Sequence, residues 1–237
     1  PTLSAPIGPG SRHAIVMCAE PATALLVFAR APIPGEAKTR LIPALGAQGA
    51  ALLQQRMTER ALETACAAAL GPVWLWCSPS TEHAFFASCR TRFEVGLRPQ
   101  CGPTLSERLL HAHDETFAAH TRLLVIGTDC PILTPQDLRA AAGALSAHDA
   151  VVIPAQDGGY VLLGLARPCP TAFEAIDWGS ARVLDQTLER LARAGLSYRL
   201  FEPLWDVDHP EDLARLASRA PGMLDHPDLR TWRRTRS

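Results

Sequence analysis

The feature of this sequence that most constrains its fold is the alternation of short apolar runs with longer helical stretches. The runs at 24–29, 123–127 and 150–153 contain no charged side chain. Strands that are apolar at every position are typical of a sheet that is covered on both faces. Because helix-length segments separate the runs, the pattern favours β-α-β units with parallel strands. We therefore predict an α/β fold with a single doubly wound, mostly parallel sheet and helices on both faces.

The remaining elements follow from the same patterns. A helix should begin after Thr134, since threonine is a good N-cap and the proline that follows it is tolerated in the first turn. Further strands are predicted at 73–77, 93–97, 160–165 and 198–201, and further helices at about 48–70, 104–120, 180–194 and 210–217.

Composition places the chain among ordinary globular proteins, with 47% hydrophobic and 20% charged residues over 237 positions. Nothing in the sequence marks a linker or a repeat, so we predict one domain at 23–220. A flexible leader at 1–22 precedes it, and a C-terminal tail at 221–237 follows it. Met17 is a candidate for the true start of the protein.

The charge pattern and the cysteines exclude several classes of protein. A net charge of −1 argues against general binding to nucleic acid or membranes. Seven cysteines without a Cys-x-x-Cys pair argue against a disulfide framework or a structural zinc site, and reduced thiols fit a cytoplasmic protein. No apolar run reaches membrane-spanning length, and residues 1–20 lack the apolar core of a signal peptide. We interpret the basic tail as solvated; its arginines are Arg230, Arg233, Arg234 and Arg236.

The first predicted strand leads into a loop that carries cations. Residues 30–40 read RAPIPGEAKTR, in which two prolines and a glycine fix an irregular path. Backbone N–H groups and cations at a strand exit suit a polyphosphate, so Arg30, Lys38 and Arg40 are candidate nucleotide contacts. The Walker pattern Gly-x-x-x-x-Gly-Lys is absent. A solvated basic turn is the alternative, and spacing alone does not decide between the two.

An aspartate follows the most apolar predicted strand, in the segment Gly127-Thr-Asp-Cys-Pro131. It should emerge at the carboxyl edge of the sheet, where ligands bind in such folds. Hard divalent cations take carboxylate oxygens and keep water and phosphate as further ligands, so Asp129 is a candidate metal ligand. The alternative is a turn in which Asp129 bonds to its own backbone before Pro131.

A second acidic segment follows the last predicted strand. Asp206 and Asp208 are two residues apart and face the same way if the backbone is extended. Asp208 could complete the metal site from the other side of the cleft. The alternative is that Asp208 caps the helix predicted to begin near Pro210.

The connection Gln156-Asp-Gly-Gly-Tyr160 joins two predicted strands. Gly158 and Gly159 permit positive φ and the close approach of a ligand to the backbone. A plain hairpin turn explains the glycines equally well. The position of Asp157 at the same sheet edge favours function, so we predict that Asp157 is catalytic and lines the acceptor or sugar pocket.

Taken together, four segments resemble one family; they are 28–41, 126–131, 154–160 and 206–213. In that order they resemble the GT-A-fold, nucleotide-diphospho-sugar-transferase-like group of selenodomain-associated or arsenosugar-biosynthesis glycosyltransferases. The similarity spans roughly residues 24–217. The first and last segments are also similar to 2-phospholactate guanylyltransferases and, more distantly, to molybdenum-cofactor guanylyltransferases.

The resemblance implies roles for particular residues. Lys38 and Arg40 match the basic loop that meets nucleotide phosphates, and residues 157–159 match the pocket loop. Asp129 matches the metal-binding aspartate after the central strand. Asp208 matches the late position that completes the metal site in related nucleotidyltransferases.

This chain departs from the pattern at two places. Trp178-Gly-Ser180 stands where relatives often read Trp-Ser/Gly-Thr, which is a mild change. Residues 102–108 read GPTLSER where many relatives read Gly-Asp-Leu-Gly-Glu-Arg. The resemblance places this segment on the acceptor side of the pocket, where this chain lacks the aspartate and the second glycine of the family pattern.

Three functions fit these observations. The first is a metal-dependent glycosyltransferase that uses a nucleotide-activated donor, with Mg²⁺ or Mn²⁺, and a small-molecule acceptor. The second is a guanylyltransferase-like nucleotidyltransferase acting on a phosphorylated small molecule. The third is a nucleotide-binding protein without catalysis. We favour the first, because the segment 156–160 and Trp178 match the glycosyltransferase-like group better. The sequence does not reveal the base, sugar, acceptor or oligomeric state.

Overall fold

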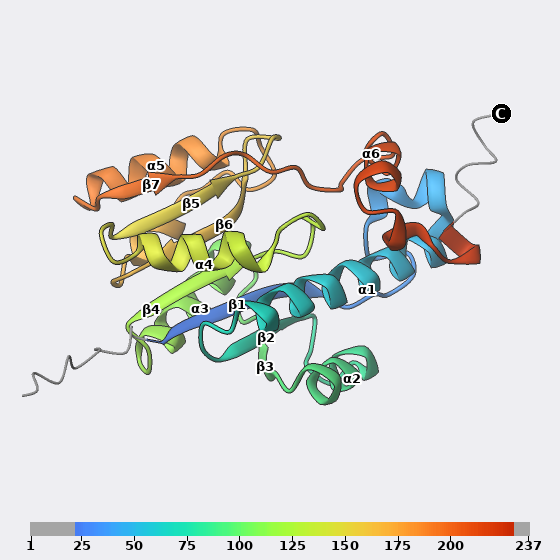
Figure 1. The fold of residues 1–237 in the computed structure, drawn as a ribbon, viewed down its shortest axis with the longest axis horizontal. Helices are drawn as coiled ribbons and strands as arrows, with labels where there is room; N and C mark the ends of the chain where they lie inside the picture. Colours follow the sequence, from blue (N-terminus) through green and yellow to red (C-terminus); the bar gives the residue numbers. More distant parts are fainter. Residues whose placement is uncertain (1–21, 230–237) are drawn as a thin grey trace, which may run out of the picture.

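The computed structural model describes residues 22–229, which form a seven-stranded sheet covered by helices (Figure 1). The strands are β1 (Thr23–Arg30), β2 (Val73–Ser78), β3 (Gly96–Pro99), β4 (Arg122–Ile126), β5 (Ala150–Pro154), β6 (Tyr160–Leu165) and β7 (Tyr198–Leu200). Their order across the sheet is β3-β2-β1-β4-β6-β5-β7. Strand β6 runs antiparallel to β4 and β5, and the other pairs are parallel. The predicted fold class is confirmed.

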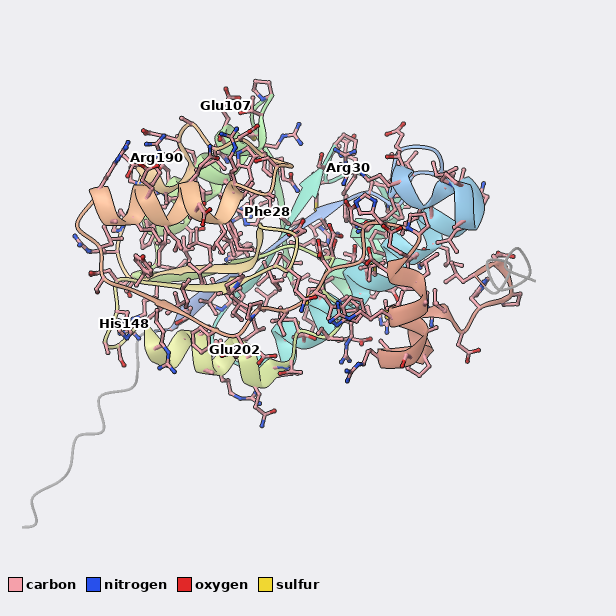
Figure 2. The ribbon with its side chains drawn as sticks, turned by 90° about the horizontal axis from the view of Figure 1, so that it is seen from above. Phe28, Arg30, Glu107, His148, Arg190 and Glu202 are labelled. Carbon is pink, nitrogen blue, oxygen red and sulfur yellow. The ribbon has the colours of Figure 1, made fainter. Side chains whose placement is uncertain are left out.

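Helices cover both faces of the sheet, as Figure 2 shows for α4 and α5, which lie on opposite sides of it. The helices are α1 (Ile42–Ala68), α2 (Ala84–Phe93), α3 (Leu105–Phe117), α4 (Pro135–Ala144), α5 (Val183–Arg193) and α6 (Asp212–Arg219). The apolar cluster on one face contains side chains of α1, α2 and α4. The cluster on the other face contains side chains of α3 and α5.

The alternation of side chains along β1 supplies both clusters. Leu25 and Val27 pack into one, whereas Leu26 packs into the other, and all three are buried. Burial on both faces explains why the central strands contain so few polar residues.

Beyond the carboxyl edge of the sheet, α6 lies beside the first half of α1 (Figure 1). A third apolar cluster packs there. It joins α1 to α6 and to two 3-10 turns, η3 (Pro221–Leu224) and η4 (Pro227–Leu229). Met223, Leu224 and Leu229 are buried in it. The packed region therefore extends through Leu229, beyond the boundary predicted at 220. Two short 3-10 turns complete the fold, η1 (Thr39–Leu41) and η2 (Pro170–Phe173).

Two predicted elements require correction. Helix α2 is not predicted from the sequence, and its last residue, Phe93, falls in a predicted strand that in fact begins at Gly96. Helix α2 is short and His83 caps it, so it lacks the usual capping signal. Helix α1 begins at Ile42, but Gly46 interrupts it with a φ of 70°, so the start predicted near residue 48 lies close to the beginning of the uninterrupted helix.

Helices α3 and α4 begin at capping boxes. The Thr104 hydroxyl accepts a hydrogen bond from the Glu107 backbone N–H, and the Glu107 carboxylate accepts one from the Thr104 backbone N–H. Thr134 and Asp137 make the same exchange at α4, which confirms the predicted start there. Within the described residues no helix combines the length and apolarity that a membrane span requires. Met17 and the basic tail lie outside the described residues.

Gly164 tests the packing of the central sheet. A Cβ atom there would lie 2.5 Å from Leu124 Cδ2 and 2.6 Å from Val151 Cγ2. We expect Gly164→Ala to destabilise the fold by about 1–3 kcal/mol through overpacking, measured by urea denaturation. Gly143→Ala in α4 is the control, since a Cβ there meets nothing within 4 Å. Equal stabilities of the two variants would contradict this account of the sheet.

Candidate functional site

A cavity of about 500 Å³ opens at the carboxyl edge of the sheet, where the predicted basic loop meets the exit of β4. The candidate residues Arg30, Lys38, Arg40, Asp129 and Asp208 all line it. They come from the end of β1, the loop before α1, the exit of β4 and the segment before α6. The fold thus brings together both cationic and acidic candidates that are far apart in the sequence.

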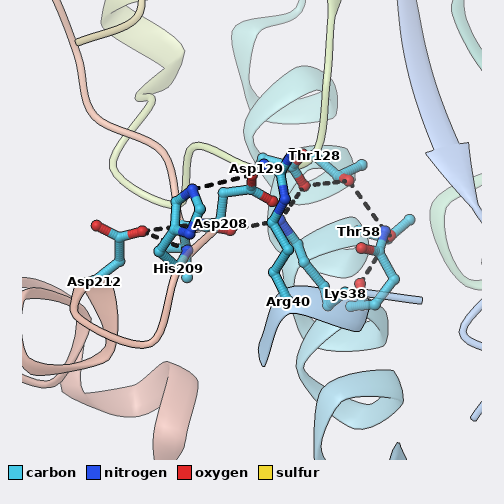
Figure 3. Close-up of polar contacts among 10 residues, drawn as sticks. Lys38, Arg40, Thr58, Thr128, Asp129, Asp208, His209 and Asp212 are labelled. Carbon is cyan, nitrogen blue, oxygen red and sulfur yellow. Dashed lines mark hydrogen bonds and ion pairs between the residues drawn. The ribbon is translucent and has the colours of Figure 1, made fainter. Parts of the chain in front are cut away.

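Lys38 is held at the inner wall of this cavity. Its backbone is left-handed, with φ 48° and ψ 45°, and its side chain is only 4% exposed. The ammonium nitrogen lies 2.8 Å from Asp129 Oδ1 and donates to the Val207 carbonyl oxygen at 2.5 Å (Figure 3). A buried charge is tolerated when it is paired and hydrogen-bonded, and Lys38 meets both conditions.

Arg40 forms the second ion pair of the site, with Asp208 (Figure 3). Both side chains are accessible to solvent, at 59% and 36% exposure. The alternative that Asp208 caps α6 is wrong. The helix begins at Asp212, whose carboxylate accepts from the backbone N–H groups of Asp208 and His209 at 3.0 and 2.7 Å. The Asp208 carboxylate is therefore directed to Arg40 and the cavity.

The backbone around Asp129 is anchored from two directions. The Val207 N–H donates to the Asp129 carbonyl at 2.8 Å, which joins the exit of β4 to the segment before α6. Gln54 of α1 donates to the Thr128 hydroxyl at 3.1 Å, and that hydroxyl donates to Asp129 Oδ1 at 3.4 Å. Among residues 22–229 the Asp129 carboxylate bonds to Lys38 and Thr128 rather than forming the alternative turn before Pro131.

Further polar groups line the cavity and were not identified from the sequence. Gln100 donates from Nε2 to the carbonyl oxygens of Ala29 and Trp76, at 3.1 and 2.8 Å. Arg108 of α3 donates from Nε to the Gly102 carbonyl at 2.8 Å. Gln100 directly follows β3, and Arg108 ends the segment 102–108 that we compared with the family pattern, but we assigned neither residue a role.

A smaller cavity of about 110 Å³ adjoins the first. Gly127 and Asp129 line both cavities, and Asp206 and Tyr160 line only the smaller one. Burial raises the pKa of the Asp206 carboxyl to about 6, and the nearby charges of Asp157 and Asp129 act in the same direction. The smaller cavity therefore has an acidic wall.

The connection that carries Asp157 is a hairpin between β5 and β6, closed by a hydrogen bond from the Ala155 N–H to the Gly159 carbonyl. The Asp157 carboxylate is exposed and accepts from the Gly159 N–H at 2.9 Å. The hairpin turn, which was the alternative explanation of the two glycines, is therefore present. Asp157 borders neither cavity, although its charge acts on Asp206.

The glycines of this hairpin contact protein rather than a cavity. Gly158 has a φ of 93°, and a Cβ atom there would lie 2.3 Å from the Ala181 carbonyl oxygen. Its own carbonyl accepts from the Leu184 N–H at 2.9 Å. Neither Gly158 nor Gly159 lines the two cavities, so a contact with phosphate stays a prediction for both.

Trp178 stands beside the hairpin and bridges to α3. Its indole N–H donates to the Ser106 hydroxyl at 2.8 Å. Its ring meets the Tyr160 ring edge-on, with centroids 6.1 Å apart. The tryptophan that we singled out in the sequence is therefore a partly buried wall between the hairpin and α3.

The side chains available as metal ligands determine which metal ion this site could bind. Asp129 and Asp208 offer two carboxylates, and each is paired with a cation. No group of three or more acidic, histidine or cysteine side chains within the described residues could hold a metal ion. Two carboxylates fit Mg²⁺ or Mn²⁺ only when phosphate oxygens and water complete the shell.

The comparisons place the chain in a family. The model of the DUF2064 family, described as "Uncharacterized protein conserved in bacteria", matches residues 61–180, about half of the chain. The chain belongs to the DUF2064 family. The matched range includes Asp129 and Asp157, whereas Lys38, Arg40 and Asp208 lie outside it. A search of curated proteins gave no match.

Solved structures share the fold of this DUF2064 chain. It is 26% identical to a candidate nucleotide-diphospho-sugar transferase from Desulfovibrio desulfuricans G20, with a TM-score of 0.77 over 91% of this chain and 96% of that chain. It is 11% identical to 4-diphosphocytidyl-2C-methyl-D-erythritol synthase from Anaerococcus prevotii DSM 20548, with a TM-score of 0.57 and coverages of 83% and 98%. It is 16% identical to a CMP:2-keto-3-deoxy-manno-octonic acid synthetase complexed with CTP, with a TM-score of 0.52 over 85% of this chain and 100% of that chain. The last two similarities establish the fold alone.

The raised pKa of Asp206 predicts a pH-dependent change in stability. The folded protein binds this proton more tightly than the unfolded chain, so the carboxyl destabilises the fold progressively as pH rises from about 4 through about 6. In a chelator, we expect Asp206→Asn to be more stable than the native chain at pH 8 by about 1 kcal/mol. This value is discounted because the carboxylate is only half buried. The gain should disappear at pH 4 in urea denaturation; a gain that is independent of pH would refute the assignment.

Proposed function

We propose that this protein is a metal-dependent transferase that uses a nucleotide-activated donor and transfers a glycosyl group to a small-molecule acceptor. The observation that carries the proposal is the pair of cation–carboxylate contacts, Lys38–Asp129 and Arg40–Asp208, at the edge of a cavity large enough for a nucleotide. The similarity to a candidate nucleotide-diphospho-sugar transferase supports the coarser conclusion that the chain is a nucleotide-using transferase.

The cations and carboxylates of the two ion pairs can exchange each other for phosphate oxygens and a metal ion when ligand binds. Without ligand, each carboxylate is neutralised by a cation of the chain. A nucleotide diphosphate group and a divalent cation arrive together with opposite charges. Lys38 and Arg40 can then turn to phosphate oxygens, and Asp129 and Asp208 can turn to the metal. Arg30, at the same cavity wall, is a third candidate contact for the phosphates.

Transfer of the glycosyl group then requires stabilisation of the charge on the diphosphate leaving group and an acceptor oxygen that attacks the anomeric carbon. An acceptor oxygen forms a bond to the anomeric carbon while the bond from that carbon to the diphosphate breaks. The electron pair leaves with the nucleoside diphosphate, whose charge Lys38 and Arg40 share. A bound divalent cation would supply further neutralisation of this leaving group. We propose that Asp157 accepts the proton that the acceptor loses. Asp157 is an exposed carboxylate, and its charge raises the pKa of Asp206.

Two alternatives use the same residues. A nucleotidyl transfer would direct Lys38 and Arg40 to a pyrophosphate leaving group, and a phosphorylated acceptor would attack the α-phosphorus. A non-catalytic protein would only bind the nucleotide. Analysis of products from a nucleotide sugar and from a nucleoside triphosphate, each with a mixture of acceptors, separates all three.

A thermal-shift screen tests the proposal directly. We expect one class of nucleotide sugar to raise the melting temperature more in the presence of Mg²⁺ or Mn²⁺ than in a chelator. A ligand at 100 times its dissociation constant stabilises the fold by about 2.7 kcal/mol. A panel of nucleoside triphosphates and nucleotide sugars that gives no shift with either metal would refute nucleotide binding.

The cationic loop supplies a second test. Arg40→Ala and Lys38→Ala should each weaken nucleotide binding by about 1.5–3 kcal/mol, because each removes a charge-assisted hydrogen bond. Lys38→Ala should also lower stability, since it leaves the Val207 carbonyl and Asp129 without their partner. Calorimetry gives the affinities, and Arg90→Ala on the exposed face of α2 is the control. Unchanged affinity in both loop variants would contradict the assignment.

Metal binding should depend on the nucleotide. Mg²⁺ alone should shift the melting temperature little, because Lys38 and Arg40 already neutralise the two carboxylates. Asp129→Asn and Asp208→Asn should each abolish the Mg²⁺-dependent part of the nucleotide shift. Asp185→Asn, an exposed aspartate of α5, serves as the matched control. If Mg²⁺ acts equally on all four proteins, the metal site lies elsewhere or does not exist.

A further inference from the structure

A groove of about 990 Å³ lies between α1 and α6, outside the candidate site. It shares no lining residue with the larger cavity at Lys38 or with the smaller cavity at Asp206. Its charged lining consists of five arginines and two glutamates: Arg56, Arg60, Arg92, Arg215, Arg219, Glu59 and Glu63. A surplus of positive charge therefore gathers in this arginine groove, although the whole chain has a net charge of −1.

The two glutamates do not neutralise this surplus, because both bind the same arginine. The guanidinium nitrogens of Arg92 lie 3.2 Å from Glu59 Oε2 and 3.1 Å from Glu63 Oε1. The other four arginines form no ion pair within residues 22–229. Each helix contributes two of them, one turn apart: Arg56 and Arg60 of α1, Arg215 and Arg219 of α6. Side chains four residues apart share one face of a helix, so both pairs are presented to the same groove.

One arginine of each pair is held in place by neutral groups. Arg56 donates from Nη2 to the Gly222 carbonyl at 2.5 Å. Arg215 donates from Nη1 to the side-chain carbonyl of Gln156 at 2.7 Å, and its guanidinium carbon lies 4.6 Å from the centre of the Trp205 ring. These contacts position the two guanidinium groups without neutralising them. Positioned arginines suit phosphate groups in particular, since the planar guanidinium can bind phosphate in a bidentate manner.

The lining favours a compact anion over single-stranded nucleic acid. Trp205 is the one aromatic residue among the lining residues; it is 5% exposed, and Arg215 lies over its ring. Single-stranded nucleic acid binds to aromatic side chains on which its bases stack, and the groove offers no such surface. The charge of four unpaired arginines matches linked phosphate groups better than one or two carboxylates.

We propose that the arginine groove is a second binding site of this protein, and that its ligand is a small anion with two or more linked phosphate groups. Arg56 and Arg215 contact the phosphates from opposite walls, and the exposed Arg60 and Arg219 add outer contacts. The four cations repel one another in the empty groove, and a polyphosphate removes that repulsion. The inference does not depend on the proposed function, because no residue of the candidate site lines the groove.

The test uses the full chain with Arg40→Ala, which weakens polyphosphate binding at the candidate site, in a chelator that prevents metal bridging to Asp129. Calorimetric titration at constant ionic strength measures the affinity for tripolyphosphate. We expect saturable binding. Free polyphosphate and the phosphate chain of a nucleotide share the proposed chemistry, so ATP is titrated in parallel. Tighter binding of tripolyphosphate assigns the site to free polyphosphate, and tighter binding of ATP assigns it to a nucleotide.

Substitutions of the outer arginines assign the binding to the groove. Arg60→Gln and Arg219→Gln, each added to the Arg40→Ala chain, should weaken tripolyphosphate binding about tenfold, since each removes a charge-assisted contact. Both side chains are exposed, and the melting temperature without ligand verifies that the variants fold. Arg90→Gln is the matched control, because Arg90 is exposed on α2 and does not line the groove.

Several outcomes would overturn the inference. These are the absence of saturable binding, an affinity that both groove variants leave unchanged, and an equal loss of affinity in Arg90→Gln. Sulfate that binds as tightly as tripolyphosphate would show general attraction of anions rather than a polyphosphate site. Tighter, groove-dependent binding of hexaglutamate or of a single-stranded oligonucleotide would overturn the proposed class of ligand. The nucleotide-sugar screen on the native chain judges the proposed function separately.

Discussion

A buried ammonium group holds the carboxyl edge of this sheet together. Lys38 belongs to the loop after β1, Asp129 follows β4, and the Val207 carbonyl comes from the segment after β7. A charge that is 4% exposed needs oxygen partners, so these three segments must converge wherever Lys38 is placed. The backbone bond between Val207 and Asp129 closes the same junction. The shape of the larger cavity follows from this contact.

Much of this arrangement could be predicted from the sequence, for a simple reason. Parallel strands end at one edge of a sheet, so polar residues that follow apolar runs gather there. Lys38, Arg40, Asp129 and Asp208 obey that rule. Gln100 follows β3 at the same edge, but that strand reads GLRP and lacks the apolar run that reveals a strand exit, and Arg108 reaches the cavity from the first turn of α3 through packing. Periodicity also failed at α2, where the helix is short and capped by histidine.

The hairpin at 156–160 shows why a local motif can have two interpretations. Its glycines suit both a ligand and a turn, and the structure shows the turn, with Gly158 pressed against the Ala181 backbone. That contact joins the hairpin to the segment that carries Trp178. The two walls therefore form a single packed unit. A glycine pattern alone could not reveal this, since Ala181 carries no distinctive signal in the sequence.

The junction at Lys38 also has a consequence for the order in which the protein matures. The lysine and Asp129 are synthesised early, but the carbonyl that completes the environment of the ammonium belongs to Val207, and the partner of Arg40 is the next residue. A nascent chain that has exposed its whole central sheet still lacks half of the site. Competence to recognise a ligand therefore arises only after Asp208 has been synthesised, and a chain truncated before residue 207 lacks both the carbonyl partner of Lys38 and the carboxylate partner of Arg40.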